Sequence, residues 1–482
     1  MNPPAPSRSE KSTRSNKSGM AVSEEINLEL FLTELFKKCF CPYPVALGRE
    51  YTLYFSEQGK GSRIRESKTE FKHLNLNTTA VPPSDSDSDE VDGSKADIDA
   101  ENTIAITAIH DHSNRLTEIQ IAKYRKQPIP KIVLHLLGLV LSKYPKLNKL
   151  TIKNCRINMI VIEELSKSLP LSTITELCLD GSPVTMANYD LLLNYPLIIK
   201  SLSLSRCQIN DVVCEQITSK LFYLESAEEH LTVLNLSSNR IGDNGAKQFA
   251  DALKSNRHLR YLNLADNLIT DVGADYIFNT LIQFKLTNDE NMDRRKKYML
   301  HLKKKLELYH GCLEKLAEIH KTSTLNKCSG VTTTAGKQKQ NYRKERARSA
   351  SIHVENIPLK AELMAKELVG PFEHPYGPSN VRVEDGYPHC IGNLVLCYLN
   401  LAFNNLTYIS VTKLLSVVMY QRINATPNMP GIMKIVLDGN YLPENCVELV
   451  TISTILDKHI ASFHEKDKST STKKGGLDRK NI

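Results

Sequence analysis

Aliphatic residues recur along this chain with one fixed set of spacings. Leu231, Leu234, Leu236, Asn239 and Ile241 show the pattern, in which the fourth position is polar or a cysteine and the other four are aliphatic. The alternation of apolar and other residues around the second and third positions predicts a short strand with one buried face. A single strand of this kind cannot bury its apolar face alone, so we expect the copies to stack on one another.

Seven copies of this pattern are complete, and they start at Leu147, Ile174, Ile199, Leu231, Leu259, Leu396 and Ile432. A partial copy at Leu116, Ile119 and Ile121 precedes them and has Tyr124 at the fourth position. In the complete copies the fourth residue is Cys155, Ser182, Cys207, Asn239, Asn267, Asn404 or Asn440. We expect its side chain to turn inward and to satisfy backbone groups freed where the chain leaves the strand.

The return path of each copy is long enough for a helix. The first five copies start 27, 25, 32 and 28 residues apart. Apolar residues at helical spacing follow Asp243 and Asp271, and we expect each aspartate to cap its helix. The block N-x-I-x-D-x-G-A occurs twice, and in this the chain resembles the ribonuclease-inhibitor-like class of leucine-rich repeats. The resemblance implies an α/β solenoid with a curved parallel sheet and outer helices. The gap in the repeats and the composition add a long basic insertion that interrupts the solenoid and disordered termini that flank it.

Composition shifts divide the chain into segments. We predict a disordered tail over 1–22, a helix with a flanking segment over 23–79, an acidic Ser/Asp linker over 80–101, repeats over 102–285, a basic helical or disordered insertion over 286–393, repeats over 394–463 and a basic tail over 464–482. The helix near residue 30 has an apolar stripe that fits a cap on the solenoid or a partner-binding helix. Residues 102–108 alternate in polarity and are expected to pair with residues 117–121 as a terminal cap.

The insertion begins with a heptad-like seam. Its apolar residues are four, three, four and three residues apart: Leu302, Leu306, Tyr309, Leu313 and Leu316. Such a helix can pack along the solenoid, form a coiled coil with a partner or bind a calmodulin-type protein, and the sequence leaves these three alternatives open. The Thr/Ser-rich segment from Thr322 to Ile352 is expected to be flexible.

The positive charge of the chain is concentrated in the same insertion. Residues 294–348 contain sixteen Lys/Arg and four Asp/Glu, a net charge of +12. The whole chain carries +8, so the remaining residues carry a net −4. An acidic surface, such as that of tubulin, would be attracted to this one segment.

No motif for chemistry is found in the sequence. There is no phosphate-binding glycine loop, no nucleophile elbow and no zinc-protease motif, and the eleven cysteines form no C-x-x-C pair. We therefore predict a chain that is not an enzyme, with no catalytic residues, cofactor, metal or small-molecule substrate. The apolar run 132–141 is too short to cross a bilayer, so no membrane contact is expected. The cysteine usage favours a reducing compartment such as the cytoplasm.

Three groups of residues are candidates for function. The predicted concave-face residues are Lys149, Lys153, Arg206, Tyr261, Asn263, Tyr398 and Asn400. The basic residues of the insertion are Arg294, Arg295, Lys296, Lys297, Lys303, Lys304, Lys305, Arg343 and Lys344. The candidate phosphorylation sites are Ser84, Ser86 and Ser351. Among the concave-face residues the two tyrosines are the strongest candidate anchors, because tyrosine offers a large contact area at a small entropy cost.

The stretch from Gly392 to Leu401, together with the early Tyr-Thr-Leu-Tyr-Phe at 51–55, resembles the leucine-rich repeat-containing protein 71 family. The resemblance implies a non-catalytic scaffold or adaptor of ciliated cells and sperm, with axonemal or tubulin-containing protein partners. One alternative is a small-GTPase regulator of the Ran GTPase-activating type, but the acidic C-terminal tract typical of those proteins is missing. Another is nucleic-acid binding through the basic insertion, which is disfavoured because aromatic residues are not interleaved with the basic ones.

Overall fold

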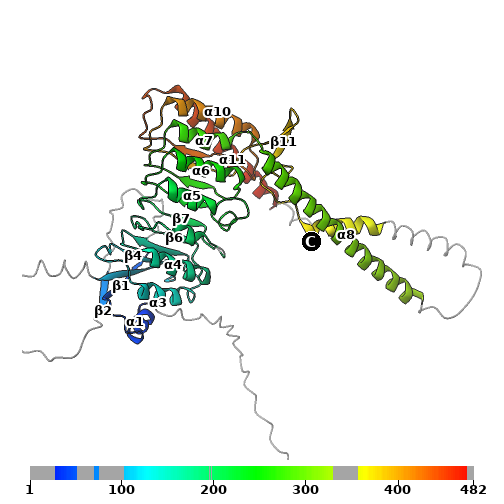
Figure 1. Ribbon diagram of the computed structural model, residues 1–482. Coiled ribbons are helices and arrows are strands. Elements are labelled where there is room, and N and C mark those ends of the chain that lie inside the picture. Colours follow the sequence, from blue (N-terminus) through cyan, green and yellow to red (C-terminus); the bar gives the residue numbers. More distant parts are fainter. Residues whose placement is uncertain are drawn as a thin grey trace, which may run out of the picture.

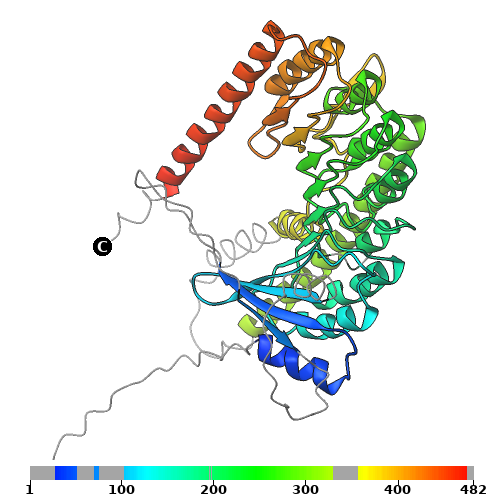
Figure 2. The same cartoon turned by 90° about the vertical axis from the view of Figure 1, so that its left-hand side faces the viewer.

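The computed structural model describes residues 28–51, 70–74, 103–194, 196, 198–328 and 356–474. The copies of the repeat form one parallel ladder of short strands: β4 (Leu116–Ala122), β5 (Lys149–Lys153), β6 (Glu176–Cys178), β7 (Ser201–Ser203), β8 (Val233–Asn235), β9 (Tyr261–Asn263), β13 (Tyr398–Asn400) and β14 (Lys434–Val436). Figure 2 shows the strands lining the inner side of a crescent and the helices covering its outer side. The chain is therefore an α/β leucine-rich-repeat solenoid, as predicted.

Helices return the chain from one strand to the next (Figure 1). They are α3 (Lys131–Leu141), α4 (Met159–Ser168), α5 (Asp211–Ser219), α6 (Asp243–Ser255), α7 (Asp271–Leu281) and α10 (Tyr408–Asn424), with the short 3₁₀ helices η1 (Leu169–Leu171) and η2 (Tyr189–Leu193). Helix α11 (Val447–Lys474) follows the last strand, β14. Phe249 and Phe278 face inward from α6 and α7 and are fully buried. The sheet and the helices thus enclose one continuous aliphatic core.

The fourth residue of each repeat connects neighbouring repeats. Asn404 accepts hydrogen bonds at Oδ1 from the backbone N–H of Ile269, at 3.1 Å, and donates from Nδ2 to the carbonyl of Leu264, at 2.9 Å. It also donates to carbonyls of its own repeat. Asn239, Asn267 and Asn440 bond in the same way, and the thiol of Cys207 donates to the Leu179 carbonyl. This residue therefore satisfies buried backbone groups in two repeats at once, as expected.

The residue before each fourth position takes a left-handed backbone conformation. The seven residues with this positive φ are Asn154, Gly181, Arg206, Ser238, Asp266, Phe403 and Gly439. A single left-handed residue turns the chain sharply out of the strand and brings the following side chain into the core.

The aspartates of the N-x-I-x-D-x-G-A block do not cap their own helices, contrary to our expectation. Asp243 is the first residue of α6, and it accepts hydrogen bonds from the backbone of Thr270 and Gly273 in the next repeat. A Cβ atom on Gly273 would lie 2.5 Å from the Asp243 carboxylate, so glycine is needed for this approach. The block therefore connects the helical layer, as the asparagines connect the strand layer.

The N-terminal end of the ladder is covered by a mixed sheet and a helix. Strand β3 (Ile104–His110) pairs antiparallel with β4, which confirms the predicted terminal pairing, and β1 (Val45–Tyr51) and β2 (Glu70–Leu74) extend the same sheet. Helix α1 (Leu28–Lys38) buries its apolar stripe in the solenoid core, and Lys143 lies 4.1 Å from the ring of Phe31. Of the two alternatives for this helix, the structure supports the cap.

The insertion forms a separate arm, and we use this name for residues 284–390. Strands β10 (Phe284–Lys285), β12 (Tyr387–Cys390) and β11 (Val381–Glu384) make a small sheet at its base. Helix α8 (Asn288–Cys328) then runs outward, and a second helix over 356–369 lies across it (Figure 1). Our prediction of a flexible segment from Thr322 is wrong up to Cys328, where α8 ends. The predicted basic tail from residue 464 likewise begins inside α11.

Replacing Asn404 with alanine should destabilise the solenoid. The buried N–H of Ile269 and the carbonyl of Leu264 would lose a partner, so we expect the free energy of unfolding to fall by about 2–4 kcal/mol. Urea unfolding followed by circular dichroism measures this change. The exposed neighbour Asn405 is the matched control, and Asn405→Ala should stay within about 0.5 kcal/mol of the unmodified chain. If both changes lowered the free energy of unfolding equally, Asn404 would not connect neighbouring repeats as we infer.

Candidate functional site

Two tyrosines form an aromatic platform on the concave face. Tyr261 on β9 and Tyr398 on β13 occupy the same register position, and their rings stack with centroids 4.0 Å apart and planes 6° apart. Both side chains are partly exposed. The two strands are neighbours although the arm separates them in sequence, because the repeat after the arm stacks directly on the repeat before it. We call this pair the tyrosine platform.

Polar groups surround the tyrosine platform. Asn263 and Asn400 lie on the same strands, and their Oδ1 atoms accept hydrogen bonds from the backbone N–H of Ala265 and Ala402, at 3.1 and 3.0 Å. The Nζ of Lys434 on β14 lies 5.9 Å from the centroid of Tyr398, within cation–π range. The platform therefore offers an aromatic surface with amide and ammonium groups beside it, as protein-binding hot spots do.

The hydroxyl of Tyr261 stays protonated at neutral pH. Burial, with the neighbouring Tyr398 hydroxyl, raises the pKa of Tyr261 to about 12. Tyr261 is thus a neutral hydrogen-bonding group and not an anionic one.

The other predicted concave-face residues lie away from the tyrosine platform. Lys149 and Lys153 are on β5, four strands from β9, and the Nζ of Lys149 is 3.1 Å from a carboxylate oxygen of Glu118. Arg206 is exposed, but it lies in the left-handed turn after β7 and not on the strand. The structure therefore brings together the two tyrosines and their asparagines, and it separates them from these three basic residues.

A polar network that the sequence analysis missed crosses the middle of the face. The Ser203 hydroxyl donates to the Asp180 carboxylate at 2.6 Å, and Asn235 donates to Ser203 at 2.9 Å. The Ser237 hydroxyl donates to that of Ser205 at 3.0 Å. The small polar residues in this part of each repeat were the available signal. Their side chains bond to one another across neighbouring strands.

A cleft of about 680 Å³ lies where the arm meets the solenoid. Nδ1 of His258 is 3.2 Å from the Glu228 carboxylate, and this hydrogen bond raises the pKa of His258. The arm contributes His374, whose ring meets Tyr223 edge-on at 4.9 Å and whose pKa burial lowers. The His374–Tyr223 contact holds the base of the arm against the solenoid, while the His258–Glu228 pair lies within the solenoid wall of the cleft.

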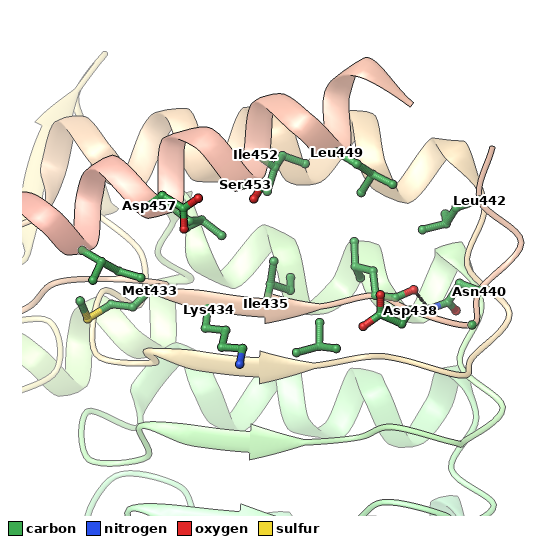
Figure 3. A pocket seen from close by; sticks show the side chains of 15 residues that line it. Met433, Lys434, Ile435, Asp438, Asn440, Leu442, Leu449, Ile452, Ser453 and Asp457 are labelled. Atoms are coloured by element: carbon green, nitrogen blue, oxygen red, sulfur yellow. Dashed lines mark hydrogen bonds between the residues drawn. The ribbon is translucent and has the colours of Figure 1, made fainter. Parts of the chain in front are cut away.

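A second groove, of about 810 Å³, lies at the C-terminal end of the ladder. Figure 3 shows Leu449 and Ile452 on α11 above Ile435 on β14, with Asp457 and Lys434 nearer one end. Its lining is mostly aliphatic and continues the side chains of the core. This groove belongs to the end of the solenoid, and it shares Lys434 with the surroundings of the tyrosine platform.

The predicted basic residues from Arg294 to Lys305 lie on α8. Arg295, Lys296, Lys303 and Lys304 are exposed; Arg294, Lys297 and Lys305 are partly covered. The Nζ of Lys297 is 2.8 Å from the Asp293 carboxylate and 4.6 Å from the centroid of Tyr223, so this lysine faces the solenoid. Arg343, Lys344 and the candidate phosphorylation sites Ser84, Ser86 and Ser351 lie outside the described residues.

The described ranges contain neither a metal-binding cluster nor a helix suited to span a membrane. No group of three or more His, Cys, Asp or Glu side chains there is arranged to hold a metal ion. No helix in those ranges combines the length and apolarity that a membrane span needs. The ten cysteines whose side chains are described are free thiols, and Cys155 and Cys207 serve at the fourth repeat position.

Comparison with known proteins agrees with the repeat assignment. A family model described as Leucine Rich repeat matches residues 229–250 and 255–278. Among solved structures the chain is similar to an internalin from Listeria monocytogenes, with 12% identity, 72% of this chain and 69% of that chain covered, and a TM-score of 0.27. It is also similar to TLR13 in complex with ssRNA13, with 17% identity, 33% of this chain and 20% of that chain covered, and a TM-score of 0.22. No curated protein matches the chain.

The His258–Glu228 contact should stabilise the fold more at low pH. Because the pKa of His258 is raised in the folded chain, its contribution is fully present below about pH 6.5, the value expected for an unperturbed histidine, and is lost as the pH rises through the folded value. His258→Gln should therefore cost more stability at pH 5.5 than at pH 8.5. The difference should not exceed about 1 kcal/mol, because the side chain is half-exposed.

Urea unfolding at the two pH values measures this difference. His310→Gln, at an exposed position on α8, is the control. If His258→Gln lowered the free energy of unfolding by the same amount at both pH values, the ion pair would not form.

Proposed function

We propose that this chain is a non-catalytic scaffold or adaptor that holds protein partners on two separate surfaces, the concave face and the arm. The observation that carries the proposal is the tyrosine platform. Two stacked aromatic rings lie partly exposed on the open side of a rigid sheet, where they are held in register by the backbone of both strands. Rigid aromatic groups of this kind dominate the binding energy of many protein interfaces, because they lose little entropy on binding.

We further propose that the scaffold works in the cytoplasm at the axoneme of cilia or flagella. The support for this is the resemblance of residues 392–401 and 51–55 to the leucine-rich repeat-containing protein 71 family. The charge of the arm is compatible with this location, because residues 294–306 contain seven Lys/Arg and no Asp/Glu. Tubulin-containing structures present acidic surfaces that such a segment would attract. This role requires neither a small-molecule substrate nor a membrane contact.

Imaging and extraction of a tagged full-length chain in multiciliated cells would test the location. The expected result is signal along the axoneme that resists detergent and persists as salt is raised, because a built-in component is held by more than screened surface charge. Diffuse signal released at low salt would contradict the axonemal role. Signal in the nucleus that is lost with salt would instead indicate a nucleic-acid contact.

The double change Tyr261→Ala and Tyr398→Ala should remove binding at the concave face. If the platform is a hot spot, partners that bind there should lose on the order of thirtyfold or more in affinity, while the melting temperature should change little because both rings are partly exposed. Affinity purification with quantitative mass spectrometry from ciliated cells, repeated with the variant, measures the loss. Tyr441→Ala is the matched control, since this tyrosine is 74% exposed on a loop beyond β14. Retention of every partner by the double variant would refute the role of the concave face.

A further inference from the structure

Helix α8 carries a strict heptad repeat that begins earlier than the sequence pattern suggested. Met292, Met299, Leu306 and Leu313 are each seven residues apart. Arg295, Leu302, Tyr309 and Leu316 follow them by three residues each and are also seven apart. These two series are the a and d positions of a coiled coil, and Arg295 is the one charged residue among them.

The first part of this seam has no partner within the described residues. Met292, Met299, Leu302 and Leu306 are 63%, 55%, 38% and 56% exposed, respectively. Four large apolar side chains in one stripe are unusual on the surface of a soluble domain and mark an interaction site. Leu359, Leu363 and Leu368 of the second arm helix are also more than half exposed. Both helices of the arm therefore expose large apolar side chains.

The opposite side of α8 is already in use. Lys297 is an f position, opposite the seam, and it packs over the ring of Tyr223 on the solenoid. The second arm helix packs on another side, the g side that flanks the seam, where Cys312 is buried and the Nζ of Lys305 lies 3.9 Å from the Glu362 carboxylate. Ala361 and Ala365 of that helix are fully buried. A partner can therefore approach the seam from one side only.

The charges beside the seam have one sign. The e positions of the first two heptads are Lys296 and Lys303, both exposed, and the g position of the second is Lys305, which already faces Glu362 of the second arm helix. Residues at e and g form the ion pairs that select the partner of a coiled coil. Lysines there repel a second copy of this chain and attract a helix with Glu or Asp at the same positions.

We propose that α8 is one half of a heterotypic coiled coil, whose other half is a partner helix with apolar a and d residues and acidic e and g residues. An acidic residue of the partner faces Arg295. A calmodulin-type protein that encloses its target helix is excluded, because the solenoid covers the f side of α8 and the second arm helix covers its g side. This interface extends the proposed scaffold role to the arm, and it does not depend on binding at the tyrosine platform.

A synthetic peptide of four heptads, with Leu or Ile at a and d and Glu at e and g, tests this proposal. Its own glutamates keep it from pairing with itself. We expect the full-length chain to bind it by fluorescence anisotropy, and to ignore the same peptide with Lys at e and g. Leu302→Ser with Leu306→Ser should weaken binding at least about thirtyfold, because two a/d contacts are lost.

Charge reversal gives the sharper test. Lys296→Glu with Lys303→Glu should weaken binding of the glutamate peptide on the order of tenfold or more and create binding of the lysine peptide. Lys304→Glu, an exposed f position, is the matched control and should leave both affinities within about twofold. Two outcomes would overturn the proposal by reducing the contact to unspecific charge attraction. One is that Lys304→Glu loses as much affinity as the double change at Lys296 and Lys303, and the other is that the leucine variants lose no affinity.

Self-association of the full-length chain also bears on the proposal. Analytical ultracentrifugation should show that the unmodified chain is a monomer. If the unmodified chain is instead a dimer and the leucine variants are monomers, a second copy occupies the seam and the proposal is overturned. The Tyr261 and Tyr398 variants should bind the peptide normally. Failure of the peptide test alone therefore leaves the concave-face function standing, and failure of the platform test alone leaves the coiled coil standing.

Discussion

Every repeat of this solenoid depends on one constraint, which is that the backbone groups freed where the chain leaves a strand must find partners inside the core. Water cannot reach them there, and each unpaired group would cost about 1–3 kcal/mol. One side chain per repeat solves this by bonding to its own repeat and to the preceding one, as Asn404 does with Leu401, Leu264 and Ile269. Because each bond spans two repeats, it also fixes their relative register.

That register is what creates the candidate site. Tyr261 and Tyr398 stack because their strands are held at the same height, with Leu262 opposite Leu399 in the core. A slip of one residue would turn each tyrosine to the other face of its strand. The stacking of the two rings is thus a consequence of the internal hydrogen bonds, and the strand layer and the Asp–Gly contacts of the helical layer both contribute to it.

The same local bonding explains how a long arm can interrupt the repeats. A solenoid needs contacts only between neighbouring repeats, so a segment that leaves and returns at one junction does not disturb the ladder. The chain packs closely where it re-enters the repeats after the arm. A Cβ on Gly392 would lie 2.5 Å from the Ile282 carbonyl oxygen, and Asn393 donates hydrogen bonds to the carbonyls of Leu253 and Asn256. The arm is therefore free to carry a second surface of different chemistry, basic and apolar, whereas the tyrosine platform is aromatic.

The sequence alone determined the repeat architecture, because the spacing of Leu, Ile and Asn reports a local requirement that each repeat meets in the same way. It also identified Tyr261 and Tyr398, since alternation along a strand decides which residues leave the core. Only the tertiary structure decided that these two rings meet, that Arg206 lies in a turn, and that Asp243 bonds to the next repeat. It also decided which side of α8 stays uncovered. The stacking depends on which repeats become neighbours after the chain returns from the arm, and a contact between residues more than a hundred positions apart leaves no periodic trace in the sequence. The Arg206 turn and the Asp243 bonds depend on the backbone conformation at the end of a strand and on the packing of adjacent repeats, which the spacing of apolar residues does not report.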